Sequence, residues 1–302
     1  EIRLSLVGSE MCIRDSFSGV NGGGVASTTE YVYDQRGRLL KQVTPEGVAT
    51  TQNTNDFVSH YVYDTLGRLI QSTDAEGQVT HIAYQESQQR ILTTAANGLI
   101  TTRVVDFAGR TVSMTQGKVL GQSQDFDAFG SQSFFYNDEG QLVVSVDQLQ
   151  QPTYYFYNEK GQLAYQVDVQ NRVTGFEYDL AGNLIKTTRF ASLNGQNLGT
   201  LTKDNNGNLT VTGLISTEQF AANQIVDTQD RVSRSFYDDA NRKAFDQNAE
   251  GFVIAYHYDD FGRLLTSKAY EKANVISVSG SKASLLATAG SYRLSRNIYD
   301  KD

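Results

Sequence analysis

Three histidines and several adjacent carboxylate pairs are the side chains that could take part in catalysis or metal binding. His60, His81 and His257 lie far apart in the chain, and none has a Cys, Glu or His at the spacing of a metal-binding motif. Asp238-Asp239 and Asp259-Asp260 could in principle form the acid–base pair of a glycosidase. Both pairs recur within the same short pattern, however, so one structural cause explains them better. We therefore expect no catalytic residue, no metal site and no bound cofactor.

Two short segments resemble ligand-binding loops but lack the residues that such loops need. Residues 204–208 (DNNGN) resemble the start of a calcium loop, without the glycine at its sixth place or the closing glutamate. The three glycines at 22–24 are too short and isolated a run for a phosphate loop. We interpret 204–208 as a turn of the repeat described below and 22–24 as a flexible lead-in.

Composition excludes several classes of protein. The 302 residues contain 26 Lys+Arg and 34 Asp+Glu, and the net charge of −8 argues against nucleic-acid binding. No stretch approaches the roughly 18 to 20 apolar residues that a membrane span requires. A single cysteine, Cys12, excludes an intramolecular disulfide framework. The composition leaves unexplained why a chain without Trp has 17 Tyr and 26 Gly.

A short pattern that recurs along the chain explains this surplus. Its full form is Tyr-x-Tyr-Asp-x-x-Gly-Arg-Leu, and we call the second aromatic position the anchor. Six of the eleven steps between consecutive anchors are 21 residues. The 10-residue step from Phe126 to Tyr136 suggests a half unit, and the 41-residue step from Tyr258 to Tyr299 suggests two units. The anchors are Tyr33, Tyr63, Tyr84, Val105, Phe126, Tyr136, Tyr157, Tyr178, Lys203, Tyr237, Tyr258 and Tyr299.

The residues after each anchor predict a β-hairpin turn. Asp or Asn at the first turn position can accept hydrogen bonds from the following backbone amides, and Gly or Asn three residues later tolerates a positive φ. Asn241 takes the glycine position in one copy, as this chemistry allows. A type I turn closed in this way is a common hairpin connection with a bulge. The copy at Tyr84 lacks both turn residues, so we expect a different loop there.

Second turns between the anchors leave strands of about six to eight residues, which predicts an up-and-down antiparallel meander. These turns are expected near 45–47, 74–77, 96–98 and 248–251. Thirteen of the 17 tyrosines are anchors or lie two residues before one, so they should form ladders across successive hairpins. Residues 216–223 predict a short capped helix. Residues 272–291 are either a long loop or a degenerate unit.

Residues 1–16 differ from the rest of the chain. They have neither the turn signals nor the periodicity of the repeat, and they resemble the read-through of a cloning adapter. We therefore divide the chain into a non-native leader at 1–16 and a repeat region at 17–302. An ordinary N-terminal strand is the alternative. Without the leader, the net charge changes from −8 to −7.

From Tyr31 to Asp302 the repeated Tyr-Asp-x-x-Gly-Arg-Leu units resemble the YD repeats of bacterial Rhs proteins, of the C component of insecticidal Tc toxin complexes, and of the teneurin shell. The resemblance implies an all-β fold of antiparallel hairpins in a long sheet that coils into part of a hollow shell. It also implies a secreted or cell-surface location and a partner, namely a C-terminal effector or toxin of the same parent chain. Delivery-system components or cell-surface glycans are further partners that it suggests.

Members of the family typically end the repeats with an Asp-Pro-containing autoproteolytic segment and a variable effector. The only prolines here are Pro45 and Pro152, and the sequence stops within a unit at Asp302, so we expect a fragment of the shell. Three functions remain open. The first is encapsulation of an effector, and the second is carbohydrate binding by exposed tyrosine ladders. The third is an enzyme on a parallel β-helix, which strand direction alone would exclude.

Overall fold

The computed structural model describes residues 2–7, 10–17, 27–45, 57–119, 126–205, 208–273, 276–279, 282–285 and 291–299. Almost all of these residues lie in β-strands or in the turns between them. The chain divides into two compact units. The first comprises Glu1–Ser133 with Asp147–Leu149, and the second comprises Phe134–Val146 with Gln150–Asp302.

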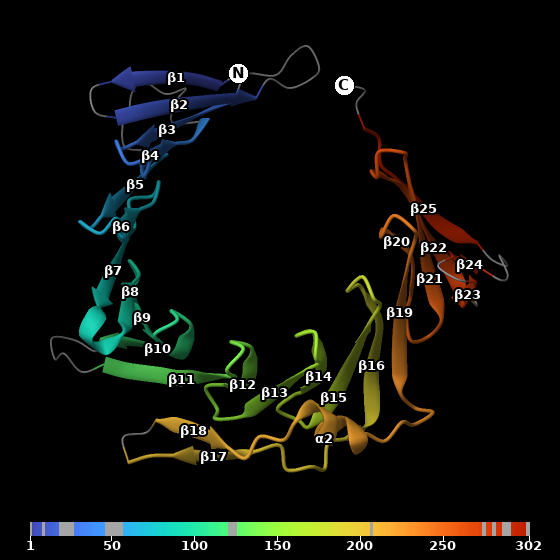
Figure 1. Cartoon of the computed structure of the whole chain (residues 1–302). Helices are drawn as coiled ribbons and strands as arrows, with labels where there is room; N and C mark the ends of the chain where they lie inside the picture. Colours follow the sequence, from blue (N-terminus) through green and yellow to red (C-terminus); the bar gives the residue numbers. More distant parts are fainter. Residues whose placement is uncertain are drawn as a thin grey trace. The chain divides into compact units, whose positions relative to one another are not determined.

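In the first unit every strand pairs antiparallel with the next one along the chain, so the predicted meander is confirmed (Figure 1). A 3₁₀ helix, η1 (Glu86–Gln88), follows Tyr84, where the sequence predicts a different loop. The strands are β1 (Ile2–Val7), β2 (Glu10–Phe17), β3 (Ser27–Tyr33), β4 (Leu39–Val43), β5 (Val58–Tyr63), β6 (Leu69–Thr73), β7 (Val79–Gln85), β8 (Arg90–Thr94), β9 (Leu99–Val105), β10 (Thr111–Val119) and β11 (Phe126–Tyr136), which continues into the second unit.

The second unit continues the same pattern but contains two hairpins outside its main sheet. Its main strands are β12 (Leu142–Val146), β13 (Pro152–Tyr157), β14 (Leu163–Val167), β15 (Arg172–Tyr178), β16 (Leu184–Leu193), β19 (Arg231–Tyr237), β20 (Lys243–Gln247), β21 (Phe252–Tyr258), β22 (Leu264–Ala273) and β25 (Tyr292–Arg296). The separate hairpins are β17 (Thr200–Lys203) with β18 (Leu209–Thr212) and β23 (Ile276–Ser279) with β24 (Lys282–Leu285). All pairings among the described strands are antiparallel, which excludes the parallel β-helix.

Two predicted repeat units are therefore insertions. Strand β16 pairs directly with β19, so the copy anchored at Lys203 is a hairpin outside the sheet rather than one of its units. Likewise β22 pairs directly with β25, so the 41-residue step to Tyr299 is one unit plus an inserted hairpin, not two units. Turn chemistry alone did not reveal this, because a hairpin turn needs the same residues wherever its strands lie.

The copy anchored at Phe126 was also predicted wrongly. Its Asp127 to Gly130 segment lies inside the single strand β11, where it pairs with Gln116 to Lys118 of β10 across a bulge. Gly130 has a φ of 145°, which is not the left-handed turn conformation of the other copies. The pattern here accommodates a bulge within a strand rather than a hairpin.

The main buried cluster lies where the insertion at residues 194–230 covers the sheet of the second unit (Figure 1). The register pairs Phe156 with Tyr165, so alternate residues of β13 to β15 form one apolar face. The helix α2 (Thr217–Ala222) places the fully buried Phe220 on this face, with its ring stacked 4.3 Å from Phe156. Ser216 and Gln219 form a capping box, so the short helix predicted at 216–223 is confirmed.

Several predictions concern residues that the structure does not describe, or describes only in part. These are the glycine run at 22–24, most of the turn at 45–47, residues 206–207 within the predicted turn at 204–208, and residues 274–275, 280–281 and 286–290 within 272–291. At the N-terminus, β1 pairs with β2 and β2 pairs with β3. The assignment of residues 1–16 as a non-native leader stays a prediction. No helix in the described part of the chain is long and apolar enough to cross a membrane.

Candidate functional site

The repeat forms a tight turn that Asp34 to Arg38 illustrate. The Gly37 amide donates to the Asp34 carbonyl at 3.0 Å, and the Asp34 amide donates to the Arg38 carbonyl at 2.9 Å. The Asp34 Oδ1 atom accepts from the amides of Arg36 and Arg38 at 2.8 and 2.9 Å. Gly37 has a φ of 75°, and Asn241 adopts 62° at the same position of its own turn. The hairpin turn predicted from Asp-x-x-Gly is confirmed.

The second turns have the same geometry. Gly77 donates to the Asp74 carbonyl at 3.0 Å and has a φ of 77°. Gly251 donates to the Asn248 carbonyl at the same distance, with a φ of 85°. The similarity of the two turns explains why the repeat has two similar halves.

The arginine of the motif binds the aspartate of its own turn. The Nε and Nη2 atoms of Arg38 both lie 2.6 Å from Asp34 Oδ2. Two copies have Asn and Gln instead, and there the side-chain amides bond to each other, at 2.7 Å between Asn137 and Gln141. No role for the arginine was predicted from the sequence. The paired change from Asp and Arg to Asn and Gln was visible in the sequence and could have revealed the contact. The other ion pairs of this kind among the described residues are Asp64–Arg68, Asp106–Arg110, Asp238–Arg242 and Asp259–Arg263, and Asp168–Arg172 forms the same pair in a second turn.

The anchor tyrosine connects its hairpin to the preceding one. The Tyr63 hydroxyl donates to the Leu39 carbonyl at 2.9 Å, and the Arg38 guanidinium carbon lies 4.9 Å from the centre of the Tyr63 ring. We call the turn aspartate, its arginine and the next anchor tyrosine the Asp–Arg–Tyr clasp. The same tyrosine hydrogen bond joins Tyr84 to Leu69, Tyr157 to Leu142, Tyr178 to Leu163, Tyr237 to Leu184, Tyr258 to Lys243 and Tyr299 to Leu264.

At Tyr63, Tyr84, Tyr258 and Tyr299 an arginine rather than a neighbouring anchor tyrosine lies over the anchor ring. Successive anchors are two strands apart, about 10 Å at the usual strand spacing, which is too far for their rings to touch. Guanidinium groups lie over them instead, with Arg68 4.1 Å from the Tyr84 ring and Arg242 4.9 Å from the Tyr258 ring. The tyrosine ladders expected across successive hairpins thus include arginines, which lie between the anchor rings of Tyr63, Tyr84 and Tyr258 and the preceding turns.

The electrostatics of the clasp follow from these contacts. The Arg38 amide makes the largest contribution to lowering the pKa of Asp34, and the Arg38 guanidinium lowers it further. The Arg68 amide is likewise the largest influence on the lowered pKa of Asp64. Burial raises the pKa of the Tyr63 hydroxyl. Burial and a hydrogen bond to Asp246 together raise the pKa of Tyr256 to about 12.

The residues considered first for chemistry do not come together. His60 lies on β5, His81 on β7 and His257 on β21. Asp238 and Asp259, the first members of the two carboxylate pairs, hold their own turns through Arg242 and Arg263. Within the described ranges, no group of three His, Cys, Asp or Glu side chains could hold a metal ion.

The anchor tyrosines offer little aromatic surface to a sugar. Most are half-buried, and their hydroxyls are bound to backbone carbonyls. Sugar recognition by stacking needs an exposed ring face, whereas an arginine covers the ring of Tyr63, Tyr84 or Tyr258. These contacts count against the carbohydrate-binding alternative.

Antiparallel hairpins joined in series by a repeated side-chain clasp define a structural β-repeat protein of the YD type. Residues 25–222, more than half of the chain, match the family model described as Teneurin YD-shell. The chain therefore belongs to the teneurin YD-shell family, and this confirms the resemblance to YD and Rhs repeats. Membership supports a structural role as part of a shell.

Solved structures that the chain matches include the TcdB2-TccC3-Cdc42 crystal structure, at 13% identity and a TM-score of 0.36, and the TcdB2-TccC3 crystal structure, at 14% identity and a TM-score of 0.35. Each match covers 94% of this chain and 19% of the other, so the chain spans about a fifth of their length. A Photorhabdus luminescens Tc holotoxin pore matches at 13% identity and a TM-score of 0.23, over 91% of this chain and 19% of that one. No curated protein matches the chain.

Proposed function

We propose that this chain is a non-catalytic wall segment of the β-shell of a secreted or cell-surface polymorphic toxin of the Rhs type. The shell encloses a C-terminal effector that belongs to the same parent chain. The role of the segment is then mechanical and steric, because it keeps the effector away from solvent and from other proteins until delivery.

The recurrence of the clasp is the observation that carries this proposal. The turn aspartates, the arginines and the anchor hydroxyls are the most regularly repeated polar groups of the chain, and they bind one another or the backbone of the preceding hairpin. Side chains used in this way stabilise a continuous wall. Family membership over residues 25–222 supports the same role.

Limited proteolysis of the complete parent protein tests the proposal. We expect the effector segment to resist a protease concentration that digests the isolated effector. A parent protein with the repeats deleted serves as the comparison, and its effector segment should be cleaved readily. Equal cleavage of the effector with and without the repeats would contradict encapsulation.

A further inference from the structure

Two Asn-Gly pairs lie within the described part of the chain, at Asn97-Gly98 and at Asn194-Gly195. An asparagine before glycine can lose its side-chain amide without an enzyme, because glycine has no side chain to hinder attack of its backbone nitrogen on the asparagine Cγ atom. Asn97 belongs to a second turn of the first unit. Asn194 begins the insertion at residues 194–230 of the second unit. The two sites therefore offer the same chemistry in two different settings.

The side-chain amide is activated in the same way at both sites. The Oδ1 atom of Asn97 accepts from the Leu99 amide at 3.0 Å, and that of Asn194 accepts from the Gln196 amide at 3.1 Å. Attack on Cγ moves negative charge onto Oδ1, so a hydrogen bond to this oxygen stabilises the intermediate. The asparagine side chains alone thus do not distinguish the two sites.

The attacking nitrogen is accessible at only one of these two sites. The Gly98 amide donates to the Ala95 carbonyl at 2.9 Å, and Gly98 is fixed in its turn with a φ of 77°. The Gly195 amide has no hydrogen-bond acceptor among the described residues, and Gly195 is exposed. The nitrogen must lose its proton before it attacks, and a hydrogen-bonded amide gives up its proton only when the local structure opens. This difference favours reaction at Asn194.

We propose that Asn194 is a site of spontaneous deamidation. Hydroxide removes the Gly195 amide proton, and the nitrogen attacks Asn194 Cγ. The new bond between this nitrogen and Cγ replaces the bond from Cγ to Nδ2, which takes up a proton from water and leaves as ammonia. Water then opens the cyclic imide at either carbonyl and gives aspartate or isoaspartate at position 194. The reaction consumes only water, and the inference does not depend on encapsulation of an effector.

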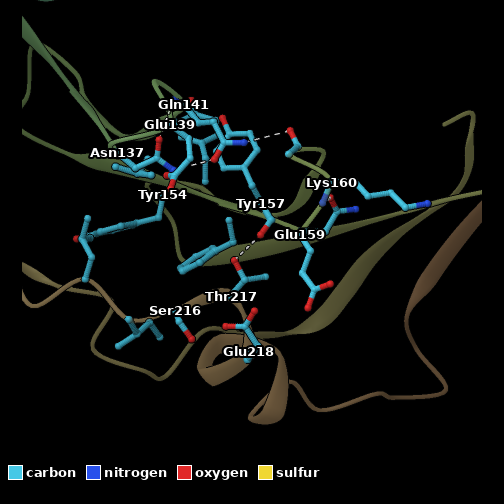
Figure 2. Close-up of a pocket in the computed structure, with 17 residues that line it drawn as sticks. Asn137, Glu139, Gln141, Tyr154, Tyr157, Glu159, Lys160, Ser216, Thr217 and Glu218 are labelled. Atoms are coloured by element: carbon cyan, nitrogen blue, oxygen red, sulfur yellow. Dashed lines mark hydrogen bonds between the residues drawn. The ribbon is translucent and has the colours of Figure 1, made fainter.

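Deamidation should loosen the start of the insertion. The Asn194 Nδ2 atom donates to the Gln196 carbonyl at 3.0 Å, and a carboxylate in its place has no proton to donate. The Gln196 side chain in turn donates to the carbonyl of Phe220, a member of the buried cluster, at 3.3 Å. The contact from the Thr217 hydroxyl to the Tyr157 carbonyl, at 2.8 Å, should still hold α2 against the sheet (Figure 2). The expected change is therefore local to the beginning of the insertion.

The test follows the masses of tryptic peptides while the full chain is kept in mildly alkaline buffer. Each deamidation raises a peptide mass by about one dalton. We expect the peptide 190–203, which contains Asn194, to gain this mass several times faster than the peptide 91–103, which contains Asn97. Fragmentation of the first peptide separates Asn194 from Asn197 and identifies isoaspartate. In concentrated urea the difference between the two sites should disappear, because the turn no longer protects Gly98.

Two variants complete the test. Gly195→Ala should fold like the parent chain, because Gly195 has open space around its Cβ position and no positive φ, and should slow deamidation several times by hindering the attack. Asn194→Asp installs one product directly and should lower the melting temperature by a few degrees. The proposal is overturned if Asn97 and Asn194 react equally fast in the folded chain, if urea leaves their ratio unchanged, or if Gly195→Ala reacts as fast as the parent. A parent-like melting temperature of Asn194→Asp would contradict the loosening of the insertion.

Discussion

The guanidinium carbon of Arg38 lies 4.9 Å from the centre of the Tyr63 ring, although the two residues belong to different hairpins. Arg38 also binds Asp34 within its own turn, and the Tyr63 hydroxyl donates to the carbonyl of Leu39, the residue next to Arg38. A single turn thus closes one hairpin and also contacts the anchor tyrosine of the next hairpin. Because this contact recurs along the chain, the residues that form each turn also hold successive hairpins in one continuous sheet.

Loss of one anchor hydroxyl should weaken this connection. Tyr157→Phe removes the hydrogen bond to the Leu142 carbonyl and should lower the free energy of unfolding by about 1 kcal/mol. Tyr154→Phe in the same strand is the control, because the Tyr154 hydroxyl has no hydrogen-bond partner among the described residues. Thermal and urea unfolding should show a loss for Tyr157→Phe only, and equal losses would argue against a specific role of the hydrogen bond.

The ion pair of the turn should be replaceable by its neutral counterpart. Arg242→Gln alone leaves the Asp238 carboxylate without its guanidinium and should lower the melting temperature by a few degrees. Adding Asp238→Asn creates the Asn–Gln pair that the turn at Asn137 already uses, so part of the loss should be recovered. A double variant that is less stable than either single variant would show that the two pairs are not equivalent.

The energetic cost of a side chain at the positive-φ turn glycine can be measured separately from the cost of steric packing. Gly262 has a φ of 81° and open space where a Cβ would lie, so Gly262→Ala should cost about 1 kcal/mol from backbone strain alone. Gly262→Asn should cost less, because Asn241 adopts the same conformation in its own turn. Gly195 has equally open surroundings without a positive φ, and Gly195→Ala should leave unfolding nearly unchanged. Equal effects of alanine at 262 and 195 would contradict the strain argument.

The turn aspartates should make the protein sensitive to acid. The folded-state pKa values of Asp34 and Asp64 are lower than the ordinary value of 3.8, so the unfolded chain binds protons more readily than the folded chain. Their contribution to stability is therefore complete above the ordinary pKa and is lost as the pH falls through the lower folded values. The urea midpoint should stay constant down to about pH 5 and then decrease. An unchanged midpoint between about pH 5 and pH 3 would contradict this contribution.

Local turn chemistry made much of the fold predictable. The turn needs a side chain that accepts backbone hydrogen bonds, as Asp34 does, and a residue that tolerates a positive φ, as Gly37 does. Asn241 meets the second requirement in its own turn. The capped helix at α2 was predictable for the same reason, because Ser216 and Gln219 satisfy each other locally. These features depend on residues within four positions of each other.

Prediction from the sequence failed where the structure depends on residues that are far apart in the chain. Nothing near Lys203 shows that its hairpin leaves the sheet, because this depends on the pairing of β16 with β19. The role of Arg38 depends on a ring 25 residues further along the chain, and the motif gives no indication of that partner. The contact of Thr217 with the Tyr157 carbonyl was equally hidden, because the fold alone brings these distant residues together.

A double-mutant cycle between Arg38 and Tyr63 tests the central claim, that the clasp joins each hairpin to the next. The free energy of unfolding is measured for the parent chain, Arg38→Gln, Tyr63→Leu and the double variant. The account predicts a coupling energy of about 0.5 to 1 kcal/mol, the value of an exposed cation–π contact. Additive effects, with a coupling energy indistinguishable from zero, would contradict it.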